Sequence, residues 1–255
     1  MYNYKTVFYT LGTLQIVLGV FMLIPVIVQI IYNQLDSGFI SASIITVIFG
    51  VLFFLSNLDH DKNIDLPQAF ILTALSWLSV AIFGSLPFIF SDLNLDFTDA
   101  FFESMSGITT TGSTILTDLD NTPKAILLWR AILQWLGGIG IILMAITLMP
   151  IMNIGGMQLF KISSQDTAEK ILPKSKEISV RLVFIYSSLT LICAVFYKIF
   201  GMNYFDSLTH SMTTIATGGF SNYNDSIGHF NSTLIEMNAV IFIILGSIPF
   251  ISYIK

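Results

Sequence analysis

The chain has 255 residues, of which 54% are hydrophobic and only 11% are charged, with a formal net charge of −5. Soluble domains carry about a quarter charged residues, so this composition excludes an ordinary soluble protein and places the chain in a lipid bilayer. The single cysteine, Cys193, excludes an intramolecular disulfide and a Cys-based zinc site, and we expect no nucleic-acid partner.

Apolar runs near the length of a membrane span recur along the chain. A helix needs about 20 apolar residues to cross about 30 Å of hydrocarbon. Runs of this kind occur at 7–31, 39–57, 66–90, 124–150, 179–200 and 234–254. The first run is too long for the apolar region of a signal peptide, so we expect it to remain as a span. The sequence therefore predicts an all-α membrane protein with six spans.

Two segments between spans do not read as plain hydrophilic loops. They cover residues 91–122 and 201–233, and both are partly apolar. Each begins with polar or acidic residues, continues with a short amphipathic stretch, and then reaches a tract of Thr and Gly. Thr and Gly have low helix propensity, so continuing the helix through the tract would cost free energy. Each segment is therefore predicted to form a re-entrant half-helix followed by extended chain.

The two segments are copies of one pattern. With an offset of 107 residues, six of fourteen positions are identical, and the pairs run from Asp99 with Asp206 to Gly112 with Gly219. Each copy has one apolar span before it and one after it. This arrangement predicts a span, pore-loop, span unit that occurs twice. The predicted organisation is an N-terminal pair of spans, a first repeat, a cytoplasmic linker and a second repeat that is truncated at its end, at residues 1–60, 61–150, 151–178 and 179–255.

The basic residues indicate which way the chain crosses the membrane. If the six spans alternate, eight of the eleven fall on one side, and these are Lys5, Lys62, Lys161, Lys170, Lys174, Lys176, Arg181 and Lys255. Cytoplasmic loops carry the Lys and Arg excess, so the N-terminus is predicted to be inside and both Thr/Gly tracts to face outward. The outward loops hold nine acidic residues, which would form a negative vestibule that concentrates cations.

The tracts carry the residues that we expect to bind an ion. Backbone carbonyls can replace the water shell of a cation, and irregular backbone is tolerated at membrane depth only where it is buried in protein or lines a watery cavity. Glycine permits the required backbone angles and leaves the passage free of a Cβ. The candidate filter residues are Thr109, Thr110, Thr111 and Gly112 in the first tract, and Ala216, Thr217, Gly218 and Gly219 in the second. We expect no cofactor and no other metal site.

Three segments resemble a known family. FTDAFFESMSGITTTGSTIL resembles the first pore loop of the bacterial TrkH potassium transporter subunits, and HSMTTIATGGFSNYNDSIGHF resembles their second. The stretch from Trp129 to Ile162 resembles their fourth span and the linker that follows it. The two extra N-terminal spans, which the related KtrB proteins lack, favour TrkH within the Trk/Ktr/HKT superfamily. The resemblance covers essentially the whole chain.

The resemblance implies potassium uptake across a bacterial cytoplasmic membrane, with Gly112 and Gly219 at the positions of the filter glycines. It also implies nucleotide-binding regulatory subunits of the TrkA type on the cytoplasmic face, and a homodimer for the full-length form. The family arranges four repeats around one pore, whereas this chain has two. Half a ring cannot enclose an ion, so we expect either a fragment or an assembly of two or more copies, and we favour a fragment.

Other functions are weighed against this one. A Na⁺-permeable protein, a secondary transporter that couples an ion through broken helices, and a non-conducting fragment all remain open. The near absence of charge inside the spans argues against the secondary transporter. An enzyme is not expected, because the sequence has no HExxH motif, no GxSxG motif and no paired aspartates inside a span. Arg130 inside the fourth span should either face protein, with Glu103 or Asp118 as a plausible partner, or reach the outer headgroups by snorkelling.

Overall fold

The computed structural model describes residues 4–60, 64, 66–152 and 171–254, and over these residues the regular secondary structure is helical. Within these described ranges, five helical segments are long and apolar enough to cross a membrane. The predicted cytoplasmic linker at 151–178 lies mostly outside the described residues. The all-α membrane architecture predicted from the sequence is confirmed, whereas the boundaries of the four predicted regions remain a prediction.

The first predicted span consists of two consecutive helices, α1 (Lys5–Phe21) and α2 (Leu23–Ile31). The break falls at Met22, three residues before Pro25. Proline has no N–H to donate to the carbonyl four residues earlier, and its ring collides with that carbonyl. The helix therefore ends at Phe21 and restarts, although the apolar run continues through both helices.

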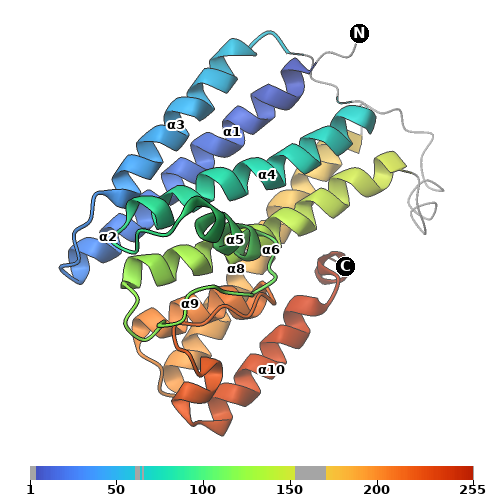
Figure 1. Cartoon of the computed structure of the whole chain (residues 1–255). Coiled ribbons are helices and arrows are strands. Elements are labelled where there is room, and N and C mark those ends of the chain that lie inside the picture. Colours follow the sequence, from blue (N-terminus) through green and yellow to red (C-terminus); the bar gives the residue numbers. More distant parts are fainter. Residues whose placement is uncertain (1–3, 61–63, 65, 153–170, 255) are drawn as a thin grey trace.

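Helix α3 (Gly38–Ser56) returns beside α1, and the two form a closely packed pair at one side of the molecule (Figure 1). Their backbones approach at two glycines. A Cβ built on Gly12 would lie 2.6 Å from the Phe54 nitrogen, and one built on Gly50 would lie 2.8 Å from the Ile16 nitrogen. Apolar side chains gain little by leaving lipid for a helix interface, so such a pair depends on close backbone packing by small residues.

The first repeat consists of α4 (Leu66–Phe90), the short α5 (Phe97–Ile108) and α6 (Lys124–Met152). Helix α6 runs through the centre of the bundle (Figure 1). Its first half is buried nearly all round, and the indole N–H of Trp129 donates to the carbonyl of Gly84 in α4 at 2.9 Å. A helix that is apolar on every face is typical of a position enclosed by protein.

The second repeat consists of α8 (Ile171–Ile199), the short α9 (Tyr204–Ile215) and α10 (Thr233–Ser247). Two 3₁₀ turns follow α9 and α10, η2 at Ser226–Phe230 and η3 at Phe250–Tyr253. The sixth predicted span, 234–254, is therefore wrong in its extent, because its α-helix has only 15 residues. Pro249 is the cause: the residue before a proline is pushed out of the helical region, and Ile248 has a ψ of 135°.

The two repeats match one another in detail. Helices α5 and α9 begin and end 107 residues apart, and each has a side-chain cap three residues before an aspartate. Asp96 accepts from the Asp99 N–H at 2.9 Å, and Asn203 accepts from the Asp206 N–H at 2.8 Å. Capping at Ncap and acidic residues in the first turn both stabilise a helix N-terminus. The internal repeat seen in the sequence is thus a repeat of structure.

We predict that Gly50→Val destabilises the α1/α3 pair. The added side chain would meet the backbone of α1, which cannot move without separating the helices. The expected loss is about 1–3 kcal/mol, the usual cost of overpacking, and it would lower the midpoint of thermal unfolding in detergent. Gly228→Ala is the matched control, because nothing lies within 4 Å of a Cβ built there. Equal midpoints for both variants would show that the close approach does not limit stability.

Candidate functional site

Each short helix ends immediately before one of the two Thr/Gly tracts, and both ends have the same hydrogen bonds. In the first tract the N–H of Thr111 donates back to the carbonyl of Ser106 at 2.9 Å. In the second, the N–H of Gly218 donates to the carbonyl of Thr213 at the same distance. Such bonds satisfy the last carbonyls of a helix and turn the chain away from its axis.

The backbone of both tracts passes twice through the left-handed region. Thr110 and Thr217 have φ values of 55° and 52°, and Gly112 and Gly219 have values of 81° and 83°. A β-branched residue at positive φ is strained, by about 1–3 kcal/mol, and persists only where its surroundings enforce it. The same strained conformation occurs at equivalent positions of both repeats, so it is a shared feature of the two tracts.

The two tracts meet at their glycines. A Cβ built on Gly112 would collide with the carbonyl oxygen of Gly218 and would lie 3.6 Å from the Cα of Gly219. The first tract therefore has no room for a side chain at Gly112. Two segments more than a hundred residues apart in the sequence are in contact here through their backbones.

The other predicted filter residues flank this contact within their own tracts. Thr111, Thr217 and Gly219 are exposed, whereas Ala216 and Gly218 are buried. The hydroxyl of Thr109 donates to the carbonyl of Met105 at 2.7 Å and lies 2.8 Å from the hydroxyl of Thr111. The threonine side chains thus bind the end of the half-helix, leaving backbone oxygens as the larger set of potential ligands.

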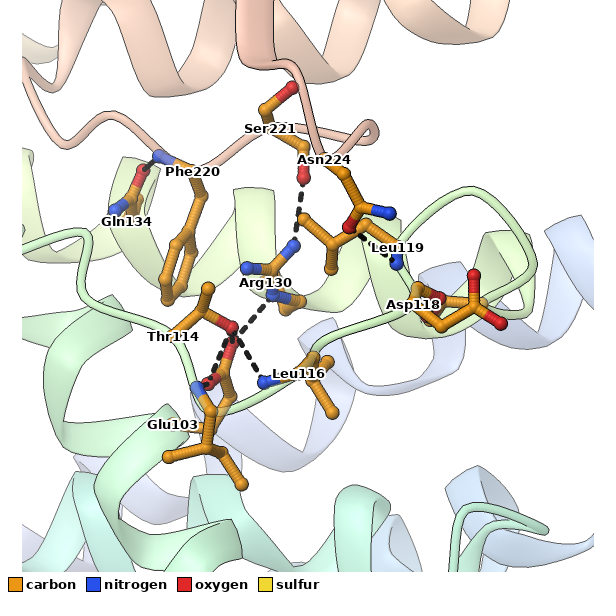
Figure 2. Close-up of polar contacts among 12 residues, drawn as sticks. Glu103, Thr114, Leu116, Asp118, Leu119, Arg130, Gln134, Phe220, Ser221 and Asn224 are labelled. Atoms are coloured by element: carbon orange, nitrogen blue, oxygen red, sulfur yellow. Dashed lines mark hydrogen bonds and ion pairs between the residues drawn. The ribbon is translucent and has the colours of Figure 1, made fainter.

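A buried ion pair lies behind the tracts. The Nε of Arg130 in α6 lies 2.7 Å from Oε1 of Glu103 in α5, and the two side chains are 1% and 0% exposed. Figure 2 shows Arg130 between Glu103 and the second tract, where its Nη1 donates to the carbonyl of Ser221 at 2.8 Å. Of the two partners expected from the sequence, Glu103 is confirmed, and Asp118 is exposed and bound to Asn121.

The carboxylate of Glu103 also binds the chain that follows the first tract. It accepts from the hydroxyl of Thr114 at 2.9 Å and from the backbone N–H of Ile115 at 3.1 Å. A buried charge is tolerated only with a partner and additional hydrogen bonds. Glu103 has both, and through them it connects the chain after the first tract to α6.

In the second repeat a histidine takes the place of Glu103. The offset of 107 residues makes His210 the equivalent of Glu103 and Ser221 the equivalent of Thr114. Glu103 is hydrogen-bonded to Thr114 in the first repeat, and His210 to Ser221 in the second. His210 Nδ1 lies 3.0 Å from the carbonyl oxygen of Asp206, so Nδ1 must carry the proton and Nε2 accepts from the Ser221 hydroxyl at 3.0 Å. Burial lowers the pKa of His210, against the effect of its hydrogen bond to Asp206. The ring is therefore neutral near pH 7.

Eight of the nine acidic residues of the loops predicted to face outward divide into two groups, and the ninth, Asp36, is half-buried. Six are exposed, and these are Asp92, Asp96, Asp99, Asp118, Asp120 and Asp225. Glu103 and Asp206 are fully buried, and Asp206 accepts from Asn222 at 2.7 Å and from the hydroxyl of Tyr223 at 2.8 Å. The predicted negative surface therefore comes from the exposed group, and the two buried carboxylates hold the loops together.

Sequence reasoning missed several residues that shape the site. Gln134 in α6 accepts from the N–H of Phe220 at 3.1 Å, and its side chain lies directly against Gly218. Neither it nor the ring of Phe220 was expected to contribute. A polar side chain in an apolar span was the available signal for Gln134, and the offset that pairs Thr114 with Ser221 was the signal for the polar contacts behind the tracts.

The fold and the site together define a helical membrane protein with two half-helix and tract units packed against a central span. A family of cation transport proteins, described by the name TrkH, matches residues 35–254. The chain belongs to this family.

Known relatives agree with that assignment. The Trk system potassium uptake protein TrkH of Vibrio parahaemolyticus is 37% identical over 253 residues, which are 97% of this chain and 52% of the relative. TrkI of Halomonas elongata is 39% identical over 96% of this chain and 50% of its own length, and TrkH of Escherichia coli K12 is 38% identical over 96% and 51%. The chain thus spans about half the length of the relatives it matches.

The structural match is equally close. The crystal structure of the potassium transporter TrkH from Vibrio parahaemolyticus superimposes with a TM-score of 0.86 and 36% sequence identity. It covers 96% of this chain, and the chain covers 50% of it. The fold of this half-length chain is that of the corresponding part of the known transporter.

We predict that Arg130→Met strongly destabilises the protein. The substitution leaves the Glu103 carboxylate buried without its counter-charge, which typically costs about 3–5 kcal/mol. The double variant Glu103→Gln with Arg130→Met should recover most of this loss, because neither charge then remains. Titration with a denaturing detergent in mixed micelles measures the free energy of unfolding. A single variant as stable as the parent would contradict the buried pair.

We also predict that His210 makes stability depend on pH. Below the ordinary histidine pKa of 6.5 the unfolded chain binds a proton at this ring while the folded protein does not. Stability is therefore complete above pH 6.5 and falls as the pH decreases, by up to about 1.4 kcal/mol per pH unit. Thermal unfolding between pH 8 and 5 (values chosen to bracket that pKa) should show a shallower loss for His210→Gln than for the parent. His229→Gln, at an exposed histidine, is the control.

Proposed function

We propose that this chain forms half of a potassium-conducting pore, and that its two Thr/Gly tracts supply backbone oxygens to the ion. The observation that carries the proposal is the contact between Gly112 and the carbonyl of Gly218, which joins two strained tracts of the same conformation. A potassium filter needs carbonyl oxygens that approach one another without side chains between them. Both tracts meet this requirement at their point of contact.

The half-helices support a cation at this place. Each is capped and acidic at its N-terminus and delivers its C-terminal end directly to a tract. The C-terminal end of a helix carries a partial charge of about −0.5, which favours a cation. The neutral His210 adds no positive charge beside the second tract, and Arg130 is neutralised by Glu103.

The surrounding arrangement fits the direction of uptake proposed for the protein. We infer that it lies in a bacterial cytoplasmic membrane with the N-terminus inside and both tracts facing outward. The six exposed aspartates would then concentrate cations at the outer entrance. The membrane potential contributes about 2.3 kcal/mol per charge for each 100 mV, which is enough to draw K⁺ inward. No covalent chemistry is required.

The partners of the whole transporter are part of the proposal. Two repeats cannot surround an ion, so we propose that two further repeats complete the ring, in the same polypeptide or in a second copy. A cytoplasmic ring of TrkA-type nucleotide-binding subunits and a homodimer of the complete form are proposed from the resemblance described above. The Na⁺-permeable protein, the secondary transporter and the non-conducting fragment are not favoured, because the named relatives are potassium uptake proteins.

A growth experiment tests this function. The chain would be expressed in a bacterium that lacks potassium uptake, both alone and in place of the matching part of the Escherichia coli relative. We expect the graft to restore growth at low K⁺. Gly112→Ser should reduce the preference for K⁺ over Na⁺ about tenfold, or roughly 1.4 kcal/mol, because its Cβ displaces the Gly218 carbonyl.

Uptake of Rb⁺ and Na⁺ into these cells gives the preference directly. Gly228→Ser is the matched control, since that glycine lies in an outward loop with open space around it. A Gly112→Ser graft that restores growth with an unchanged K⁺ to Na⁺ ratio would refute the assignment of Gly112 to the filter.

A further inference from the structure

Two polar side chains of α6 bind the backbone of the two residues that directly follow the second tract, Phe220 and Ser221. Arg130 and Gln134 are one helical turn apart, so they lie on one face of the helix. Arg130 Nη1 donates to the carbonyl of Ser221 at 2.8 Å, and Gln134 Oε1 accepts from the N–H of Phe220 at 3.1 Å. Figure 2 shows both contacts reaching the same short segment. A span of the first repeat therefore holds the tract of the second repeat.

The same face of α6 also holds the first tract. The ion pair of Arg130 with Glu103 continues through the Thr114 hydroxyl and the Ile115 N–H into the chain after Gly112. One guanidinium thus connects both tracts, with the ring of Phe220 packed on it at 4.1 Å from ring centroid to Cζ. Arg130 is thus in contact with the chain that follows the second tract and, through Glu103, with the chain that follows the first.

Gln134 acts at the point where the tracts touch. Its amide lies against Gly218, and the carbonyl of Gly218 lies against Gly112. Gly218 is therefore enclosed between the side chain of Gln134 and the backbone of the other tract. The distance between the glycines of the two tracts depends on how far Gln134 extends from α6.

The second repeat does not have these two groups. Gly137 of α6 packs against the carbonyl of Ile108, and Gly246 of α10 packs against the carbonyl of Ile215, so equivalent residues of these helices are 109 apart. The positions equivalent to Arg130 and Gln134 are Ala239 and Ile243, which are apolar. If these two polar side chains served only to pack a half-helix on a span, equivalent polar side chains would occur in both repeats. Within the described residues, this pair of polar side chains occurs only on α6, where the two tracts meet.

Stability alone does not account for these side chains either. Arg130 Nη2 and Gln134 Nε2 are both buried and have no acceptor within the described part of the protein. A buried donor without an acceptor costs free energy, so each of these side chains carries one unfavourable group beside the contacts that its other atoms make. The polar groups are retained for what their other atoms bind, the backbone of the second tract.

We propose that Arg130 and Gln134 are positioning residues that set the register of the second tract against the first, and through it the preference of the pore among cations. The proposal rests on the proposed function for its second part. Its first part concerns only the relative position of two loops. The two parts are therefore tested by different measurements on the same variants.

Cross-linking measures the register without any need for transport. Asn224 Nδ2 lies 2.7 Å from Oδ2 of Asp120, so cysteines at these two positions report whether the outer ends of the loops remain together. The full chain would be reconstituted in lipid with Cys193→Ser, Asp120→Cys and Asn224→Cys, and treated with a short bifunctional thiol reagent. The rate of cross-linking is the quantity compared among variants.

We expect Gln134→Leu, and separately Glu103→Gln with Arg130→Met, to slow cross-linking about threefold or more, the range expected for coupled residues. Gln134→Glu should cross-link at the parental rate, because the glutamate side chain still provides an acceptor for the Phe220 N–H. Gln15→Leu is the matched control: Gln15 is equally buried, but it binds Ser79 between α1 and α4. Thermal midpoints accompany each rate and identify variants that fail to fold.

If Gln134→Leu and the double variant Glu103→Gln with Arg130→Met both fold and both cross-link at the parental rate, the proposed register role is overturned. The same variants in the graft described above should lose K⁺ preference, and slower cross-linking with an unchanged K⁺ to Na⁺ ratio would overturn the specificity role. A parent graft that does not prefer K⁺ counts against the proposed function, while the cross-linking rates still decide whether α6 positions the tracts.

Discussion

The structure depends on one constraint: a peptide chain that leaves its helix among apolar spans must still satisfy its N–H and carbonyl groups. In hydrocarbon each unsatisfied group costs several kcal/mol. Both tracts meet this constraint in the same way, with the N–H groups bound back to the preceding half-helix. Both tracts also pass through the left-handed region at Thr110 and Thr217, so the backbone leaves the half-helix in the same way in the two repeats.

The two repeats have different polar groups behind their tracts. The first repeat has Glu103 in an ion pair with Arg130, whereas the second has a neutral His210 at the equivalent position. The two systems meet at Ser221, whose carbonyl binds Arg130 and whose hydroxyl binds His210. Pseudo-symmetry of the backbone is thus combined with asymmetry of the side chains, and the asymmetric contacts lie where the tracts adjoin.

Separating buried from exposed carboxylates changes the electrostatic description of the outer loops. A count of acidic residues treats all nine alike, but Glu103 and Asp206 bind backbone and amide donors inside the protein. Charges that are paired and enclosed contribute little to the field outside, whereas exposed aspartates act on ions over about a Debye length, near 8 Å in physiological salt. The exposed aspartates are the group that would act on ions outside the protein, and the two buried carboxylates hold the loops together.

The sequence by itself determined the membrane class, most of the span positions, the duplicated unit and the two tracts, because each depends on local composition or on a repeat that is visible in one dimension. It also indicated Glu103 as a partner for Arg130, since a charge within a span requires one. It did not determine that α10 stops at Ser247, because apolar content continues past the point where Pro249 ends the helix. Only the tertiary structure decided that Gly112 touches Gly218 and that Gln134 supports this contact. Those contacts join residues far apart in the chain, and no periodicity or spacing in the sequence encodes which segments pack together.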